Sequence, residues 1–115
     1  MVNKVILIGR LTADPEVKAT PNGVYVANMR LATNTYAGKD EVGNRKEQTE
    51  FHQLVAFGKS AEFAGNYLRK GRQIYAEGRL KTTAWVDTAG QKHFRTEVVL
   101  DSLSALGQKS QEEAA

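Results

Sequence analysis

A single helical segment, with strand-like runs before and after it, limits the folds open to this sequence more than any other feature. Ser60 is the expected N-cap of that helix, and Gly71 suits the left-handed residue that ends one. Small and apolar residues recur at helical spacing between them and give the helix one apolar face: Ala61, Phe63, Ala64, Tyr67 and Leu68. We therefore expect Phe63 and Tyr67 to lie in the core.

Strand-like runs, rich in β-branched and apolar residues and bounded by turn residues, make up most of the remaining sequence. Their predicted ranges are 2–11, 24–33, 49–57, 73–86 and 91–103, with a brief extended piece at 16–19. Three strands, one helix and two strands is the element order of the oligonucleotide-binding (OB) fold, a five-stranded Greek-key barrel. The order alone leaves other five-stranded arrangements open. We predict an all-β protein with one helix and this barrel as its architecture.

Chain length and composition indicate one domain. The 115 residues suffice for one modest core, so we expect an OB-fold domain at 1–106 and a short disordered tail at 107–115. Residues 34–48 lack apolar periodicity and contain Gly38, Gly43 and Asn44, which predicts a long exposed loop. The sequence has no long apolar run and no secretory signal, so we expect a cytoplasmic protein.

Catalytic and metal-binding chemistry finds little support in the sequence. There is no cysteine, which excludes disulfides and thiolate metal sites. His52 and His93 are far apart and have no carboxylate at a metal-ligand spacing. Glu47 and Glu50 are conceivable as a nuclease metal pair, but acids beside a basic segment are common. We expect no enzymatic activity, no metal and no cofactor.

The first predicted strand is apolar on both faces. Val5 and Leu7 share one face, while Ile6 and Ile8 share the other face with Lys4. A lone barrel strand should have one face in water. We therefore expect Ile6 and Ile8 to meet another subunit.

The predicted strand at 73–86 places a tryptophan among cations. Its even-numbered positions, from Ile74 to Leu80, are expected to face the core, whereas Arg79, Lys81 and Trp85 share the opposite face. An indole on a polar face favours a flat partner such as a nucleobase, and each stacked base contributes roughly 1–3 kcal/mol. The alternative is that Trp85 packs across the hairpin against Phe94 or its neighbours.

Tyr36 lies in the predicted loop together with the cations Lys39, Arg45 and Lys46. An aromatic ring in a basic loop can close over a bound strand. The alternative is a solvated loop, because nearby acids almost cancel the local charge, and the formal net charge of the whole chain is only +3.

Phe51 and Phe57 share one face of the predicted strand at 49–57, and Leu54 and Ala56 share the other. If Leu54 and Ala56 enter the core, the two phenylalanines form an exposed stacking platform. If the faces are reversed, Phe51 and Phe57 are core residues. Periodicity alone leaves both alternatives open.

Several motifs of the sequence resemble the bacterial-type single-stranded DNA-binding proteins. The motifs are Asn3-Lys4-Val5-Ile6-Leu7-Ile8-Gly9-Arg10-Leu11, Asp14-Pro15-Glu16, Glu47-Gln48-Thr49-Glu50-Phe51-His52, Phe57-Gly58-Lys59, Tyr67-Leu68-Arg69-Lys70-Gly71, Tyr75-Ala76-Glu77-Gly78 and Thr96-Glu97-Val98-Val99. The similarity runs from residue 2 to about residue 100, in order and without large gaps, and is therefore highly specific.

The resemblance implies a homotetramer of OB barrels around which single-stranded DNA wraps, with a dimer still open. It implies sequence-tolerant binding in replication, repair and recombination, in a nucleoid-associated protein. It places base stacking on Tyr36, Phe51, Phe57 and Trp85, and places His52 near the subunit contacts expected for Lys4, Ile6 and Ile8. Phosphate contacts are expected from the basic side chains nearby: Lys39, Arg45, Lys46, Lys59, Arg79 and Lys81.

The sequence departs from the family pattern in two places. Relatives often carry cations near the positions of Gln53, Thr83 and Ala84, so we expect a less basic groove and weaker or more salt-sensitive binding. Members usually end in a flexible linker and an acidic tip that recruits replication and repair proteins. This sequence ends at Gln111-Glu112-Glu113-Ala114-Ala115, so recruitment through such a tip is not expected. The alternatives to DNA binding are a protein-docking barrel, an RNA-binding protein and a nuclease.

Overall fold

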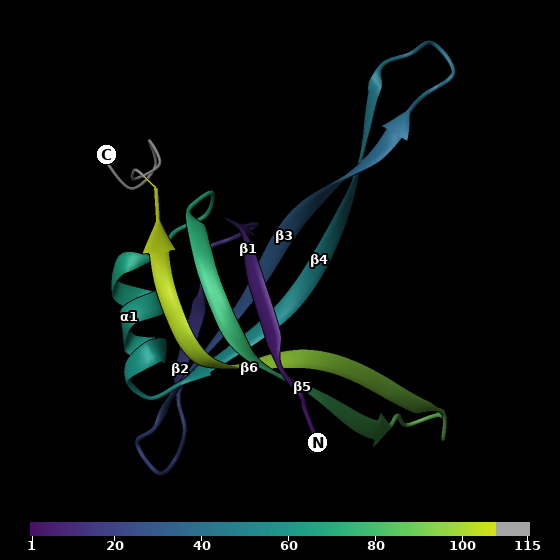
Figure 1. Cartoon of the computed structure of the whole chain (residues 1–115). Coiled ribbons are helices and arrows are strands. Elements are labelled where there is room, and N and C mark those ends of the chain that lie inside the picture. Colours follow the sequence, from purple (N-terminus) through teal and green to yellow (C-terminus); the bar gives the residue numbers. More distant parts are fainter. Residues whose placement is uncertain (108–115) are drawn as a thin grey trace.

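The computed structural model describes residues 1–107 of the chain (Figure 1). Six strands and one helix follow one another along these residues. They are β1 (Val5–Leu11), β2 (Glu16–Ala19), β3 (Tyr25–Lys39), β4 (Arg45–Phe57), α1 (Lys59–Tyr67), β5 (Gln73–Val86) and β6 (Lys92–Leu106). The predicted tail spans residues 107–115, and its residues 108–115 lie outside the described residues.

Five of the strands close into a barrel. The sheet order is β1-β5-β6-β4-β3-β2, and an additional pairing of β1 with β3 closes the ring. Every pairing is antiparallel except that of β4 with β6, which is parallel. This is the predicted five-stranded OB barrel, with the short strand β2 added beside β3.

Glycine allows two strands to approach closely where the barrel bends. A Cβ atom at Gly9 would overlap the carbonyl oxygen of Ala32 on β3, next to the point where β1 closes the ring. A Cβ at Gly78 would overlap the carbonyl oxygen of Val99, where the register of β5 and β6 shifts. The close approach of the strands at each of these places therefore depends on a position without a side chain.

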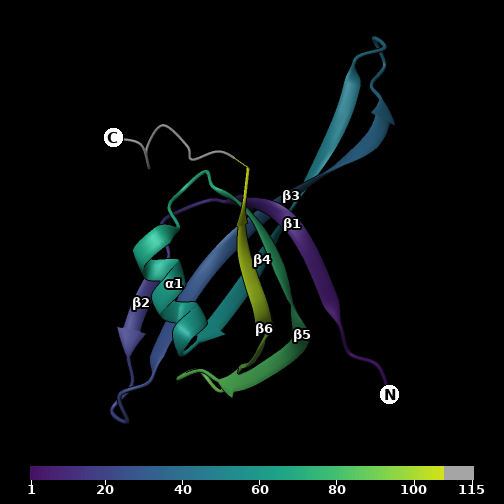
Figure 2. The ribbon, with the colours of Figure 1, turned by 60° about the vertical axis from the view of Figure 1, so that its left-hand side comes forward.

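The core fills the barrel and is covered at one side by α1. Its largest fully buried side chains are Leu31, Leu54, Leu68 and Ile74. The helix packs against β2, β3 and β4, and Figure 2 shows it lying next to β2. No helix within residues 1–107 has the length and apolar character needed to span a bilayer.

The helix differs from the prediction at both ends. Its N-cap is Gly58, with φ 63°, rather than Ser60, which already lies inside the helix. The chain becomes extended at Leu68, so Gly71, with φ 89°, serves the turn into β5 rather than the helix end.

Tyr67 is also not a core residue, because 67% of it is exposed. The buried stripe of α1 is narrow and consists of Ala61 and Ala64. Phe63 is partly buried against the core, and the ring of Tyr67 rests on it with a centroid distance of 5.5 Å. Tyr67 therefore lies beyond the edge of the apolar face that the helical spacing predicted.

Two hairpins continue beyond the barrel as arms, and Figure 1 shows that they leave it in different directions. We call residues 34–51 the β3–β4 arm and residues 79–96 the β5–β6 arm, since almost every residue in them is exposed. The predicted loop at 34–48 is wrong, because β3 and β4 pair as far as Lys39 and Arg45 and leave only a short turn. Leu80 was expected in the core but is 49% exposed, because β5 has left the barrel at that point.

Candidate nucleic-acid interface

Three of the four predicted stacking rings share one face of the ladder formed by β3 and β4. Tyr36 lies opposite Glu47, Phe51 opposite Ala32 and Phe57 opposite Val26. Paired residues point to the same side of the sheet, and Val26, Ala32 and Tyr36 are separated by even numbers of residues along β3. All three rings therefore point to the same side. Leu54 and Ala56 point to the other side and are fully buried, which decides between the two alternatives for this strand. Phe51 and Phe57 therefore form the exposed pair.

The same face continues through β6 onto β5. Val55, on the side of Phe51 and Phe57, pairs with Val99 of β6. Val99 pairs with Arg79 of β5, and the alternation along that hairpin brings Trp85 and His93 to the same side. We call this the ring face; its four rings are about half exposed: Tyr36 at 52%, Phe51 at 53%, Phe57 at 49% and Trp85 at 45%.

Guanidinium groups lie over three of these rings. The Cζ atom of Arg30 is 4.4 Å from the Phe51 centroid, and that of Arg45 is 5.0 Å from the Tyr36 centroid. The Cζ atom of Arg95 is 5.9 Å from the Trp85 centroid. Such pairs combine a flat apolar surface for a base with a cation for its phosphate.

Arg30 and Arg95 were not among the predicted site residues. The alternation of β3 could have indicated Arg30, since Met29 and Leu31 are core residues and Arg30 must face outward. Arg95 could not be placed in this way, because its position beside Trp85 depends on the register of the β5–β6 hairpin.

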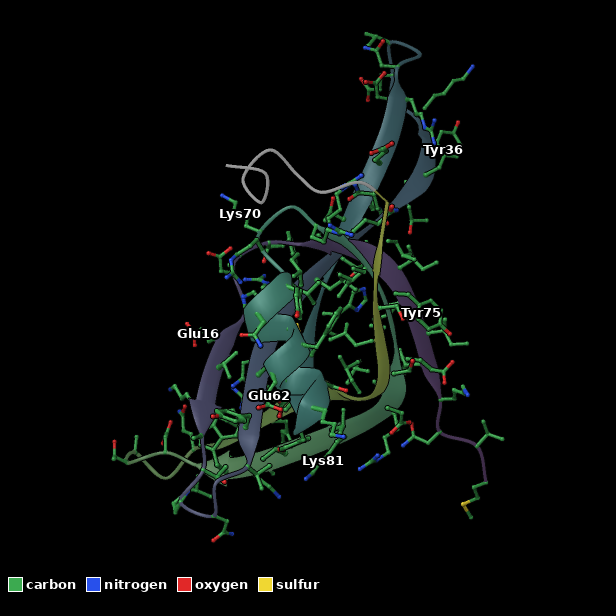
Figure 3. All side chains as sticks on the ribbon, turned by 90° about the vertical axis from the view of Figure 1, so that its left-hand side faces the viewer. Glu16, Tyr36, Glu62, Lys70, Tyr75 and Lys81 are labelled. Atoms are coloured by element: carbon green, nitrogen blue, oxygen red, sulfur yellow. The ribbon has the colours of Figure 1, made fainter. Side chains whose placement is uncertain are left out.

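The predicted phosphate contacts are distributed over both arms and the start of α1. Lys39 pairs with Arg45 near the turn of the β3–β4 arm, whereas the alternation of β4 puts Lys46 on the opposite face from Glu47. Lys59 is the first residue of α1. Figure 3 shows Tyr36 on the β3–β4 arm far from Lys81, which lies at the other side of the barrel.

Acidic neighbours reduce the positive charge of the ring face. Arg79 meets Asp101, with 3.4 Å between Nη1 and Oδ1, and Arg95 meets Glu97, with 3.7 Å between Nε and Oε1. Arg45 likewise lies 3.7 Å from Glu47. The pairs of Arg79 and Arg45 are largely exposed and so contribute little to stability. The side chain of Glu97, by contrast, is only 12% exposed.

The residues predicted at a subunit contact fall into two places. Ile6 and Ile8 are 56% and 52% exposed on the outer face of β1. Lys4 lies beside them, 3.2 Å from a carboxylate oxygen of Glu77 on β5. His52 instead lies on the interior side of β4, partly buried, with Nε2 2.8 Å from the hydroxyl of Thr33. The structure brings Lys4, Ile6 and Ile8 together and leaves His52 apart from them.

Hydrogen bonds fix the polar groups beside Ile6 and Ile8. The hydroxyl of Tyr75 donates to Glu77 over 2.7 Å. This bond raises the pKa of Tyr75, and together with Lys4 it lowers the pKa of Glu77. Glu77 is therefore held in its charged form at neutral pH.

The comparisons with known proteins agree with this geometry. The model of the single-strand binding protein family matches residues 2–106. The chain belongs to that family.

A solved structure agrees with the family assignment. The chain is similar to the Plasmodium falciparum SSB in its complex with ssDNA, with 32% sequence identity and a TM-score of 0.82. The match covers 93% of this chain and 96% of that one. The single-strand binding protein described here thus has the barrel of its family along almost its whole length.

Proposed function

We propose that this single-strand binding protein holds single-stranded DNA on the ring face, by stacking bases on Tyr36, Phe51, Phe57 and Trp85. The phosphates contact the cations around these rings, and the protein performs no catalysis. It protects unpaired strands in replication, repair and recombination, in the cytoplasm and on the nucleoid. Stacking tolerates every base, so the binding has little sequence preference.

The observation that carries the proposal is the continuity of the ring face across four strands. The parallel pairing of Val55 with Val99 joins the two hairpins and puts their aromatic residues on the same outer face of the sheet. Guanidinium groups lie over three of the four rings. An RNA-binding role is separated by competition between RNA and DNA strands of matched sequence.

The test is a titration with oligo-dT, followed by the fluorescence of Trp85 at several salt concentrations. Trp85 is the one tryptophan of the 115 residues, so its emission reports on this position alone. We expect quenching on binding, and a log-log slope of affinity against salt of about −0.7 per phosphate contacted. An affinity that does not change with salt would contradict the proposal.

For the assembly, we propose that the outer face of β1 joins subunits into a tetramer. Ile6 and Ile8 are exposed beside the Lys4–Glu77 ion pair, and a paired sheet face would remove them from water. The double substitution Ile6→Asp and Ile8→Asp is expected to give monomers in light scattering. A tetramer that persists would exclude this face as the contact.

A further inference from the structure

Trp85 is the only ring of the ring face that another aromatic side chain supports, within the described residues. His93 lies opposite it in the register of β5 and β6. Their ring centroids are 5.5 Å apart and their planes differ by 22°, a stacked arrangement. Trp85 still has 45% of its surface exposed, so part of the indole remains open to a ligand.

The imidazole of His93 is itself held in place. Its Nε2 atom lies 2.6 Å from Oδ2 of Asp87, at the start of the turn that joins the two strands. The other oxygen of Asp87 accepts hydrogen bonds from the backbone N–H groups of Ala89 and Gln91, each at 2.9 Å. One carboxylate thus ties the imidazole to the backbone of the turn.

The same bonds keep Asp87 charged. The hydrogen bond from His93 lowers the pKa of Asp87, and the backbone N–H groups of the turn lower it further. An ionised carboxylate accepts a shorter and stronger hydrogen bond than a neutral one. Asp87 therefore holds His93 over the whole neutral range of pH.

We propose that His93 is a positioning residue of the DNA site, which Asp87 fixes and which orients the indole of Trp85 for stacking on a base. This inference rests on the proposed function of the ring face. An indole near the tip of a solvated arm would otherwise sample several rotamers and lose that freedom on binding. Stacking against a fixed imidazole removes much of that loss before the DNA arrives.

Phe51 and Tyr36 do not need such a support to the same degree. The guanidinium of Arg30 covers Phe51 at 4.4 Å, and that of Arg45 covers Tyr36 at 5.0 Å. Arg95 is farther from Trp85, at 5.9 Å. Among the three rings that have a guanidinium over them, the one with the most distant cation is the one that has the stacked histidine.

The first experiment uses the protein without DNA and measures the time-resolved fluorescence anisotropy of Trp85, which reports the local motion of its indole. His93 stacks on the indole at a centroid distance of 5.5 Å and is itself bonded to Asp87. We therefore expect restricted local motion of the indole in the wild-type protein and wider, faster motion in His93→Ala.

The matched control is Phe94→Ala. Phe94 is the next residue along β6 but lies on the opposite face, where it is 64% exposed. The control is expected to retain the restricted motion of the indole seen in the wild-type protein. Motion that stays restricted in His93→Ala, or that Phe94→Ala also frees, would overturn the assignment of His93.

The second experiment is a double-mutant cycle of His93→Ala and Trp85→Ala, measured by fluorescence anisotropy of labelled oligo-dT. We expect His93→Ala alone to weaken binding about fivefold, which corresponds to ~1 kcal/mol of coupling between packed neighbours. In the Trp85→Ala background the same substitution is expected to have no further effect. His93→Phe, which keeps a flat ring without the bond to Asp87, should recover part of the loss.

The outcomes separate this inference from the proposed function. If His93→Ala weakens DNA binding equally in the wild-type and the Trp85→Ala backgrounds, His93 contacts DNA itself. If it weakens binding in neither background, the stack has no part in binding. Either result overturns the proposal. If the wild-type protein fails to bind oligo-dT, the function of the ring face fails, whereas the motion of the indole in the free protein still decides whether His93 holds Trp85.

Discussion

The two arms end in the same kind of turn but use it differently. In residues 40–44 and 87–91, an aspartate accepts two backbone N–H groups through one oxygen, and a glycine with positive φ stands at the fourth position. In the β5–β6 arm the second oxygen of Asp87 meets His93, six residues later, and His93 stacks on Trp85. In the β3–β4 arm, Lys46 stands at the position that corresponds to His93, and Gly38 at the position that corresponds to Trp85.

This difference shows how an exposed arm can order a side chain without a core. The β3–β4 arm carries Tyr36 and Phe51, each covered by a guanidinium. The β5–β6 arm carries Trp85, which its turn supports through His93. A turn that only reverses the chain in one arm thus also supports a binding residue in the other.

The largest loss of affinity is expected from the β3–β4 arm, because it carries two rings of the ring face. We expect the double variant Tyr36→Ala and Phe51→Ala to weaken oligo-dT binding by about 2–6 kcal/mol, the stacking of roughly two bases. Isothermal titration calorimetry at fixed salt measures this loss. Val42→Ala, in the turn of the same arm and 80% exposed, is the control that should bind normally.

The β5–β6 arm is expected to contribute one stacked base. Trp85→Ala should therefore weaken binding by about 1–3 kcal/mol. Phe94→Ala, on the opposite face of the same arm, should leave the affinity unchanged, although Phe94 is more exposed than Trp85 and has Lys92 5.2 Å from its ring centroid. Equal losses in the two variants, measured by fluorescence anisotropy, would mean that DNA does not distinguish the two faces.

The cations over the rings are expected to have smaller effects that depend on salt. Arg30→Gln and Arg95→Gln should each reduce the steepness of the salt dependence by about 0.7, one phosphate contact. Arg30, which is closer to its ring, also contributes a cation–π contact of about 0.5–1 kcal/mol to the fold, so Arg30→Gln should lower the melting temperature more than Arg95→Gln. Binding isotherms at several salt concentrations give the slopes, and thermal unfolding gives the stabilities. Lys92→Gln, on the opposite face, should leave the slope as it is.

The arms also show what could be predicted from the sequence and what could not. The bounds of β5 were predicted correctly as 73–86, because Ile74 and Ala76, which face the core, alternate with polar residues that face outward. The β3–β4 arm was predicted as a loop, because both of its faces are in water and its ladder is held by backbone hydrogen bonds that leave no apolar period. Periodicity identified β5 from the part of it that covers the core, whereas residues 34–48 cover no core.

The candidate site was predicted better than the arm that carries it. Aromatic rings in polar surroundings are visible in the sequence, so Tyr36 and Trp85 could be identified. Their partners could not, since Arg95 and His93 reach Trp85 only through the pairing of β5 with β6. Pairing registers depend on turn length and on shifts such as the one between Glu77 and Gly78, which leave no local pattern.

The smallest expected effect compares the two turns as a function of pH. The pKa of Asp87 is lowered in the folded protein from its ordinary value of 3.8, first by His93 and then by the turn. A carboxyl group with a lowered pKa stabilises the fold at pH values above its ordinary pKa, and this stabilisation is lost as the pH falls through the folded value. Asp87→Asn should therefore lower the melting temperature slightly at pH 7. The difference should shrink as the pH falls below 3.8 and vanish once the carboxyl group is protonated in the folded state as well.

The control for this effect is Val42→Ala, which changes an exposed side chain without charge in the turn of the β3–β4 arm. Its melting temperature should differ from that of the wild-type protein by the same small amount at pH 7 and at acid pH, when thermal unfolding is followed by circular dichroism. If Asp87→Asn behaves in the same way, the bond to His93 adds nothing to the stability of the turn. The β5–β6 arm would then be ordered by the backbone hydrogen bonds of its ladder alone, as the β3–β4 arm is. The two turns would differ in sequence, but this difference would not affect the stability of the fold.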